Sequence, residues 1–144
     1  MKKDFDYSTI PYAFMHCLQQ ECPHSADCLR YQVALYAPPE KTHFPVVNPT
    51  HIAGRKENCP YFKPDRLTRF ALGFTNLFEN LPHKKAIELR KAMYIYFQRS
   101  TYYRLRNKER LITPEEQEYI RQLFRNRGIT EEPVFDEYIE KYDW

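Results

Sequence analysis

The stretch His16–Tyr31, HCLQQECPHSADCLRY, carries three of the four cysteines of this 144-residue chain. Cys17, Cys22 and Cys28 fall within twelve residues, and Cys59 follows 31 positions later, directly before a proline. Thiols placed this close together form disulfide bonds, bind a metal, or are small buried side chains with no common role. The choice among these three roles decides how the N-terminal part of the chain is held together.

A metal site is the role that four clustered thiols favour. Four thiolates are the ligand set of a closed tetrahedral zinc site and also of an iron–sulfur cluster. The pattern C-x4-C-x5-C lacks the C-x2-C pairs of a zinc ribbon, and its gaps exceed those of ferredoxin-type clusters. We therefore predict a Zn²⁺ site, with an iron–sulfur cluster as the alternative, formed by Cys17, Cys22, Cys28 and Cys59. The neighbouring His16 and His24 are alternative zinc ligands, or simply packing and surface histidines.

The cysteines could also be buried thiols or disulfides. Cys17 and Cys28 would act as small buried hydrophobes if they lie on helix faces that pack into a core. Disulfides need an oxidising compartment, but the first residues place two lysines before Asp4 and Asp6, without the apolar stretch of a secretory signal. We therefore expect a reducing, cytoplasmic location. No run approaches the ~20 apolar residues that a membrane span needs.

The composition predicts a mainly α fold. Three glycines against eleven prolines favour helices joined by stiff loops over a sheet built on glycine turns. Short helices are expected at residues 12–20 and 25–36, while four prolines exclude a helix from residues 37–51. We predict one compact helical domain over residues 1–144, with at most a short hairpin. Its two parts are an irregular, cysteine-bearing region and a helical region, at residues 1–64 and 65–144.

The helical region contains four patterns with apolar residues three and four positions apart. They cover residues 64–81, 82–99, 113–128 and 132–144. The first has an amphipathic stripe made of Leu67, Phe70, Ala71, Phe74, Leu77 and Phe78. In the second, Ile87, Met93 and Tyr94 are the expected apolar side. The third has the clearest start signal, because Thr113, Pro114 and Glu116 match an N-cap, a first-turn proline and a capping box.

The charges are spread unevenly along the chain. Residues 84–127 hold 12 Lys and Arg against 5 Asp and Glu, and residues 128–144 hold 1 against 6. The basic part is suited to contact a polyanion, with the acidic end folding back onto it. A second interpretation needs no function, because exposed helices commonly carry many lysines and arginines.

The basic part includes an aromatic-rich stretch, QRSTYYRLRNKERLITPEEQ, at residues 98–117. It fits either a helix over residues 100–107 that follows the helix at 82–99, or a hairpin over residues 102–112 that resembles a wing. Arginine pairs with phosphate, and tyrosine contacts sugar, base or phosphate. The predicted nucleic-acid contacts are Arg99, Tyr102, Tyr103, Arg104, Arg106, Lys108 and Arg110. In the alternative, the tyrosines pack in the core and the arginines pair with glutamates and the acidic end.

Two resemblances add to these patterns. Residues 85–127, with STYYRLRN followed by TPEEQ, resemble repressor-like helix-turn-helix sequences, although the turn lacks a small residue and residues 96–98 are bulky. The whole chain resembles an uncharacterised family of short proteins from gut anaerobes, a domain of unknown function. The matching pieces are DFDYSTIPYAFMHC, CLRY, CPYF, TPEEQEYI and FDEYIEKYDW. The second resemblance implies no activity, and it implies one co-linear domain.

Together these features predict a small metal-stabilised binding protein that contacts DNA or RNA. The alternatives are an iron–sulfur or redox protein and an adaptor that binds another protein through exposed tyrosines. No phosphate loop, nucleophile elbow or H-E-x-x-H motif is present, which favours a binding protein over an enzyme without excluding catalysis. The sequence leaves the oligomeric state open.

Overall fold

The computed structural model describes residues 5–55 and 57–144. The chain forms two compact units: unit 1 comprises Met1–Leu67 and Tyr142–Trp144, and unit 2 comprises Thr68–Lys141. The chain therefore leaves unit 1, forms unit 2 and returns to unit 1 with its last three residues. Within the described ranges, no helix is long and apolar enough to cross a membrane.

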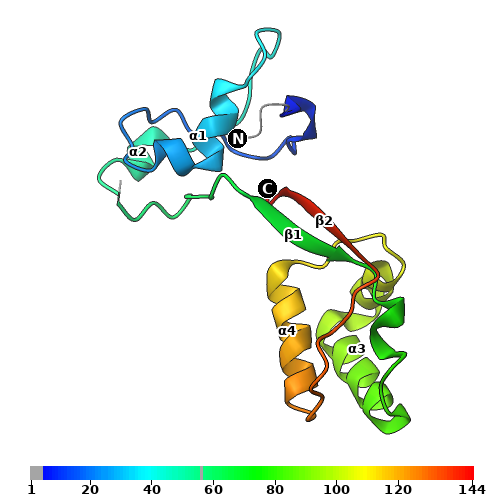
Figure 1. Cartoon of the computed structure of the whole chain (residues 1–144). Coiled ribbons are helices and arrows are strands. Elements are labelled where there is room, and N and C mark those ends of the chain that lie inside the picture. The colour runs from blue at the N-terminus through cyan, green and yellow to red at the C-terminus, as the bar shows by residue number, and fades with distance from the viewer. Residues whose placement is uncertain (1–4, 56) are drawn as a thin grey trace. The chain divides into compact units, whose positions relative to one another are not determined.

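Unit 1 consists of short helical elements joined by irregular chain. They are η1 (Tyr7–Thr9), η2 (Ser25–Asp27), α1 (Leu29–Leu35) and α2 (Pro49–Ile52), of which α1 and α2 are labelled in Figure 1. The helix expected at residues 12–20 is absent, because this segment forms turns and a parallel bridge between His16 and Val46. The helix expected at 25–36 is interrupted at Cys28, which has an extended conformation as the N-cap of α1.

Arg30 connects three segments of unit 1. Its Nη1 donates to the carbonyl oxygen of Met15 at 2.8 Å, and its Nε donates to that of Tyr61 at 2.9 Å. Its guanidinium also lies over the ring of Phe14, 4.5 Å from the centroid. One side chain on α1 thus satisfies loop carbonyls on both sides of it, which orders a region with little regular secondary structure.

Unit 2 combines a two-stranded sheet with two longer helices. Strand β1 (Leu67–Leu72) pairs antiparallel with β2 (Glu137–Tyr142), and η3 (Thr75–Phe78) follows β1. Helices α3 (His83–Arg106) and α4 (Pro114–Arg125) lie between the strands in the chain (Figure 1). The fully buried side chains include Phe74, Leu89, Met93, Leu105, Ile112 and Ile120.

The sheet shows that the predicted single, mainly α-helical domain is wrong. The segments expected as helices at 64–81 and 132–144 supply the strands β1 and β2. Gly73 has a φ of 74°, which ends any helix there, and Ala71 exchanges backbone hydrogen bonds with Ile112 at 3.1 and 2.8 Å. Partners distant in sequence thus override the local helical spacing of the apolar residues, because strand formation depends on pairing and packing.

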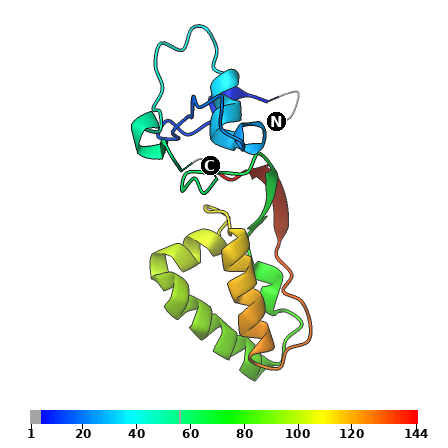
Figure 2. The same cartoon turned by 90° about the vertical axis from the view of Figure 1, so that its left-hand side faces the viewer.

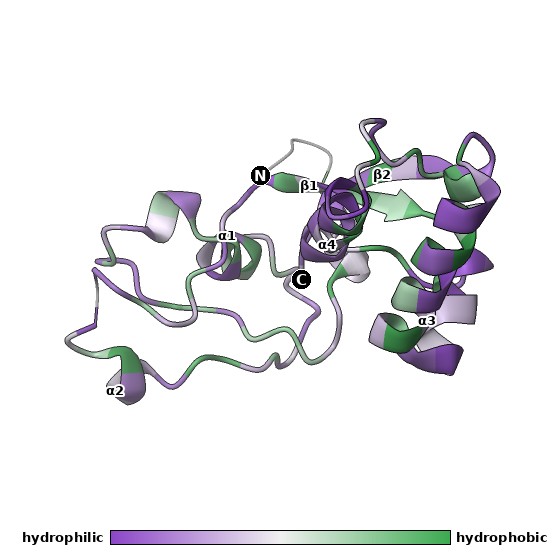
Figure 3. Cartoon of the chain, turned by 90° about the horizontal axis from the view of Figure 1, so that it is seen from below, coloured by the Kyte–Doolittle hydropathy of each residue, from purple (hydrophilic) through white to green (hydrophobic). Residues whose placement is uncertain are grey.

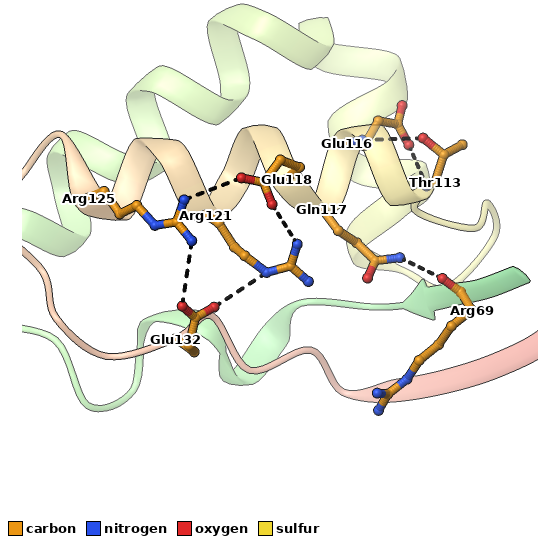
Figure 4. Close-up of polar contacts among 8 residues, drawn as sticks. All are labelled: Arg69, Thr113, Glu116, Gln117, Glu118, Arg121, Arg125 and Glu132. Atoms are coloured by element: carbon orange, nitrogen blue, oxygen red, sulfur yellow. Dashed lines mark hydrogen bonds and ion pairs between the residues drawn. The ribbon is translucent and has the colours of Figure 1, made fainter.

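Helix α4 confirms the start signal expected at residue 113. The Thr113 side chain accepts from the Glu116 backbone N–H, and the Glu116 carboxylate accepts from the Thr113 backbone N–H (Figure 4). Pro114 occupies the first turn. The buried Gln117 donates to the carbonyl oxygens of Arg69 and Ile112 at 3.0 and 3.1 Å. These two hydrogen bonds join α4 to β1 and to Ile112, which forms a bridge with Ala71 of β1.

Helix α3 is broken at Gln98, so that its two halves, residues 83–97 and 99–106, meet at an angle (Figure 2). Gln98 has φ 59° and ψ 161°, a conformation that is otherwise almost confined to glycine. In Figure 3 the ribbon of α3 alternates between hydrophobic and hydrophilic residues, as expected of a helix with one buried side. The predicted apolar side is wrong in part: Ile87 and Tyr94 are exposed, while Met93 is buried.

We expect Gln98→Gly to stabilise the protein. Backbone strain at such a residue costs about 1–3 kcal/mol, and glycine removes it at an entropic cost of about 1 kcal/mol. The free energy of unfolding, measured by urea denaturation, should rise by about 1 kcal/mol. Gln98→Ala is the control, because alanine keeps the strained conformation. An equal gain from both substitutions would contradict a break in α3 at this residue.

Asp136, just before β2, caps η3. Its carboxylate accepts from the Thr75 backbone N–H and hydroxyl at 3.1 and 2.8 Å, and from the Asn76 backbone N–H at 3.0 Å. A side chain at Gly73 would collide with this carboxylate. Burial by itself raises the pKa of Asp136, but the hydrogen bonds from Asn76 and Thr75 and the charge of Lys108 outweigh it and hold the pKa below its usual value.

We expect Asp136→Asn to destabilise the protein at neutral pH and to have little effect in acid. Because the folded pKa is lowered, the charged carboxylate stabilises the fold above about pH 4, and that contribution is lost as the pH falls through the folded pKa. The substitution should lower the free energy of unfolding at pH 7 by about 1 kcal/mol, in line with the loss of a helix cap. Urea titrations at several pH values test this.

Asp143→Asn serves as the matched control. Asp143 forms a partly exposed ion pair with Lys63 at 2.7 Å. Ion pairs in contact with solvent contribute little to stability. A pH-independent effect of Asp136→Asn, or an equal effect of Asp143→Asn, would contradict the role assigned to the Asp136 charge.

Candidate functional site

The four cysteines line one cavity of about 140 Å³ in unit 1. They come from the loop before α1, the N-cap of α1 and the turn that follows α2. These residues are Cys17, Cys22, Cys28 and Cys59. The structure therefore brings together every cysteine of the predicted ligand set, including the one that is distant in sequence.

Backbone hydrogen bonds hold the segments that carry these cysteines. The Cys17 N–H donates to the carbonyl oxygen of Arg30 at 2.9 Å, which fixes the loop against α1. Cys28 is bridged with Pro64, so the start of α1 is joined to the chain that follows Cys59. The Phe62 N–H donates to the carbonyl oxygen of Cys59 at 3.1 Å and closes its turn.

The thiols are free, since none of the four cysteines, all in the described part of the chain, forms a disulfide. Burial raises the pKa of Cys17, and the nearby thiols of Cys28, Cys22 and Cys59 raise it further. Burial also lowers the pKa of Arg30, while Cys28, Cys59 and Cys17 act in the opposite direction. Arg30 therefore lies within electrostatic reach of the cluster and would offset part of the negative charge of thiolates.

In their present conformations, the described cysteine side chains do not form a closed metal site. Among residues 5–55 and 57–144, no three Cys, His, Asp or Glu side chains converge closely enough to share an ion. A tetrahedral zinc site with Zn–S bonds near 2.3 Å places its sulfur atoms about 3.8 Å apart. The cysteine side chains would have to come closer together to reach that geometry.

The two histidines beside the cysteines have different surroundings. His24 lines the same cavity, and its Nε2 is 3.2 Å from the carbonyl oxygen of Glu57. His16 is buried elsewhere in unit 1, where its ring contacts the Tyr7 hydroxyl at 2.8 Å and stacks on Phe44. Burial lowers the pKa of His16. Of these two histidines, His24 is the one placed where it could replace a cysteine ligand.

The basic stretch is helical as far as Arg106, so the alternative of a hairpin over residues 102–112 is wrong. Tyr102 and Leu105 are buried in the core of unit 2, while Tyr103 is exposed. Of the residues predicted to contact nucleic acid, the structure exposes Arg99, Tyr103, Arg104, Arg106 and Lys108. Arg110 is half-buried.

Ion pairs divide the basic side chains into two groups. Lys108 pairs with Glu137, and Arg110 pairs with Glu116 at 2.8 Å. Two further carboxylates pair with the arginines of α4, as Figure 4 shows for Glu118, Glu132, Arg121 and Arg125. Within the part of the chain that the structure describes, no ion pair involves Arg99, Arg104 or Arg106.

A second cavity, of about 400 Å³, lies in unit 2 and was not anticipated from the sequence. Three residues of the predicted set line it, Tyr102, Tyr103 and Arg106. The first half of α3 adds Arg90, Lys91 and Tyr94. The i,i+4 spacing of Arg90 and Tyr94 was a usable signal, because it places both on one side of a helix. Their proximity to the second half of α3 depends on the break at Gln98.

Comparison with known proteins assigns the chain to a family. The model of DUF6078, a family of unknown function, matches residues 1–144. The chain belongs to the DUF6078 family. This confirms the resemblance to a domain of unknown function over the whole chain. No curated protein and no solved structure matches it.

Membership in DUF6078 brings no activity with it, so function has to be inferred from the two sites. The resemblance to helix-turn-helix sequences stays a prediction. The cysteine cavity belongs to unit 1, and the cavity between the halves of α3 belongs to unit 2.

Proposed function

We propose that this protein is a metal-stabilised, nucleic-acid-binding protein. A Zn²⁺ ion held by the four cysteines stabilises unit 1, and the exposed basic side of α3 in unit 2 contacts DNA or RNA. The observation that carries the binding role is a set of exposed arginines on α3 that have no carboxylate partner among the described residues, although the chain is rich in glutamate. Those arginines are Arg99, Arg104 and Arg106.

The metal part of the proposal is supported by the shared cavity of the cysteines. Four thiols from three segments lie around one space, and thiolates brought together without a cation repel one another. A metal ion converts that cost into folding free energy. The core of unit 1 is small and consists of Phe14, Leu29, Val33 and Tyr142. A metal ion that joins its segments would therefore add substantially to its stability. Zn²⁺ fits four thiolates in a closed structural site.

We expect protein purified anaerobically, without added metal, to contain about one Zn²⁺ per chain and to be colourless. Cys59→Ser should abolish stoichiometric zinc and lower the melting temperature, because it removes the ligand that ties the distant turn to α1. His24→Ala is the matched control, since it changes the same cavity and leaves four thiols. Elemental analysis, an absorption spectrum and thermal melts test this.

Two outcomes would contradict the zinc site. Iron with acid-labile sulfide and a brown colour would replace it with an iron–sulfur cluster. Metal-free protein whose melting temperature does not respond to added zinc or to a chelator would leave the cysteines as ordinary buried thiols.

The nucleic-acid part of the proposal rests on charge. The segment 89–108 contains six Lys and Arg and no Asp or Glu. The acidic C-terminal part neutralises only one of these six charges through an ion pair: Glu137 pairs with Lys108. Glu132 pairs instead with Arg121 of α4, outside the segment. Arginines outside these pairs, next to an exposed tyrosine, form a surface suited to phosphates, sugars and bases.

We expect the protein to bind nucleic acid with an affinity that falls steeply as salt rises. Neutralised phosphates release counterions, so the logarithm of the binding constant declines linearly with the logarithm of salt concentration. Replacing Arg99 and Arg104 by glutamine should reduce that slope by about 2, because each phosphate contact contributes about 1. Fluorescence anisotropy with duplex and single-stranded oligonucleotides at several salt concentrations measures it.

Arg125→Gln is the matched control for these substitutions. Arg125 is an exposed arginine of the same unit, and its guanidinium pairs with Glu118 and Glu132. It should change neither affinity nor slope. Absence of binding to any oligonucleotide at low salt would remove the nucleic-acid role.

A further inference from the structure

The cavity between the two halves of α3 has the chemistry of a binding site for an aromatic anion. Three cationic side chains line it, from Arg90, Lys91 and Arg106, together with three tyrosines, and none of its lining residues is acidic. Its volume of about 400 Å³ lies within the range of ligand pockets. All of its walls belong to unit 2.

The break at Gln98 builds this cavity. Along a straight helix, Tyr94 and Tyr102 would be separated by about 12 Å. In the structure their ring centroids are 5.5 Å apart, and Tyr103 is 6.4 Å from Tyr94. Phe74, next to η3, packs against Tyr102 with ring centroids 5.1 Å apart. The bend thus gathers aromatic rings from both halves of α3 around one space.

The cations of the cavity face this aromatic group from both halves of α3. The Arg90 guanidinium lies over the Phe78 ring, 4.8 Å from its centroid. Arg90, Arg106 and Tyr102 line the same cavity. Burial raises the pKa of Tyr102, and the charges of Arg106 and Arg90 act against that rise. Within the described ranges, neither arginine has an ion pair with a carboxylate.

We propose that this cavity binds one nucleotide unit of a single-stranded nucleic acid, with the base against the tyrosines and a phosphate on Arg90 and Arg106. Guanidinium groups bind phosphate through charge-assisted hydrogen bonds, and tyrosine rings stack on bases. A base inside a duplex is stacked and paired, so it cannot enter a cavity without being flipped out. The inference rests on the proposed nucleic-acid binding, and it narrows that role to a preference for single strands.

The test compares substitutions inside and outside the cavity on the whole protein. The probe is a short fluorescein-labelled oligoadenylate, measured by anisotropy at low salt beside a duplex of the same length. Tyr94→Leu and Arg106→Gln should each weaken single-strand binding at least about tenfold, the loss typical of one stacked base for Tyr94 and of one charged hydrogen bond for Arg106. Tyr96→Leu and Arg125→Gln are the matched controls, because neither residue lines the cavity. Each control should change binding less than about threefold, below the loss of one stacked base.

The melting temperature of each variant is measured to detect a folding defect. The two cavity substitutions remove different contacts, one a tyrosine ring and one a guanidinium group, so a folding defect in one variant leaves the other as a test. Adenosine monophosphate should compete for the site in the wild type and fail to compete in Arg106→Gln, whereas inorganic phosphate should compete much more weakly. These arms separate recognition of a base with its phosphate from recognition of phosphate alone.

Three results would overturn the inference, in distinguishable ways. Unchanged single-strand binding in both cavity variants, with a loss in the double substitution of Arg99 and Arg104, would keep the nucleic-acid role and reject the cavity. Equal or tighter binding of the duplex would reject the preference for single strands. Binding of adenosine monophosphate without any oligonucleotide binding would reject the nucleic-acid role and leave the cavity to a free nucleotide.

Discussion

The break of α3 at Gln98 is the constraint on which unit 2 depends. A continuous helix of 24 residues would project well beyond the small sheet, and its second half would have nothing to pack on. With the break, Leu105 returns to the core that Leu89 and Met93 enter from the first half. The same corner brings Tyr94 to Tyr102, so the packing of the core and the shape of the cavity share one cause.

The C-terminal segment closes this arrangement and also decides which charges are left exposed. Through β2 and the Asp136 cap, it places carboxylates beside Lys108 and the arginines of α4. Among the described residues, Arg90, Arg99 and Arg106 of α3 stay outside these pairs. A net charge of only +3 therefore conceals a surface that is locally cationic, because acidic side chains are engaged at different places in the fold.

Unit 1 is held together by a different set of contacts. Few apolar side chains are buried there, and the guanidinium of Arg30 replaces regular secondary structure by satisfying loop carbonyls. The cysteine cavity lies in the same region, and Arg30 is near enough to compensate anionic sulfur. The modest core of unit 1 links α1 only weakly to the turn at Cys59. A bound metal ion would add a cross-link between them.

The sequence by itself determined the features that have local causes. Thr113, Pro114 and Glu116 specify the start of α4 because cap and helix are neighbours in the chain, and the clustered cysteines indicated a common site. Only the tertiary structure decided that the apolar stretch after Leu67 is a strand, since its hydrogen-bond partners lie far along the chain. It also decided the bend at Gln98. Glutamine in a sequence does not predict a positive φ, and the packing around Gln98 imposes this conformation.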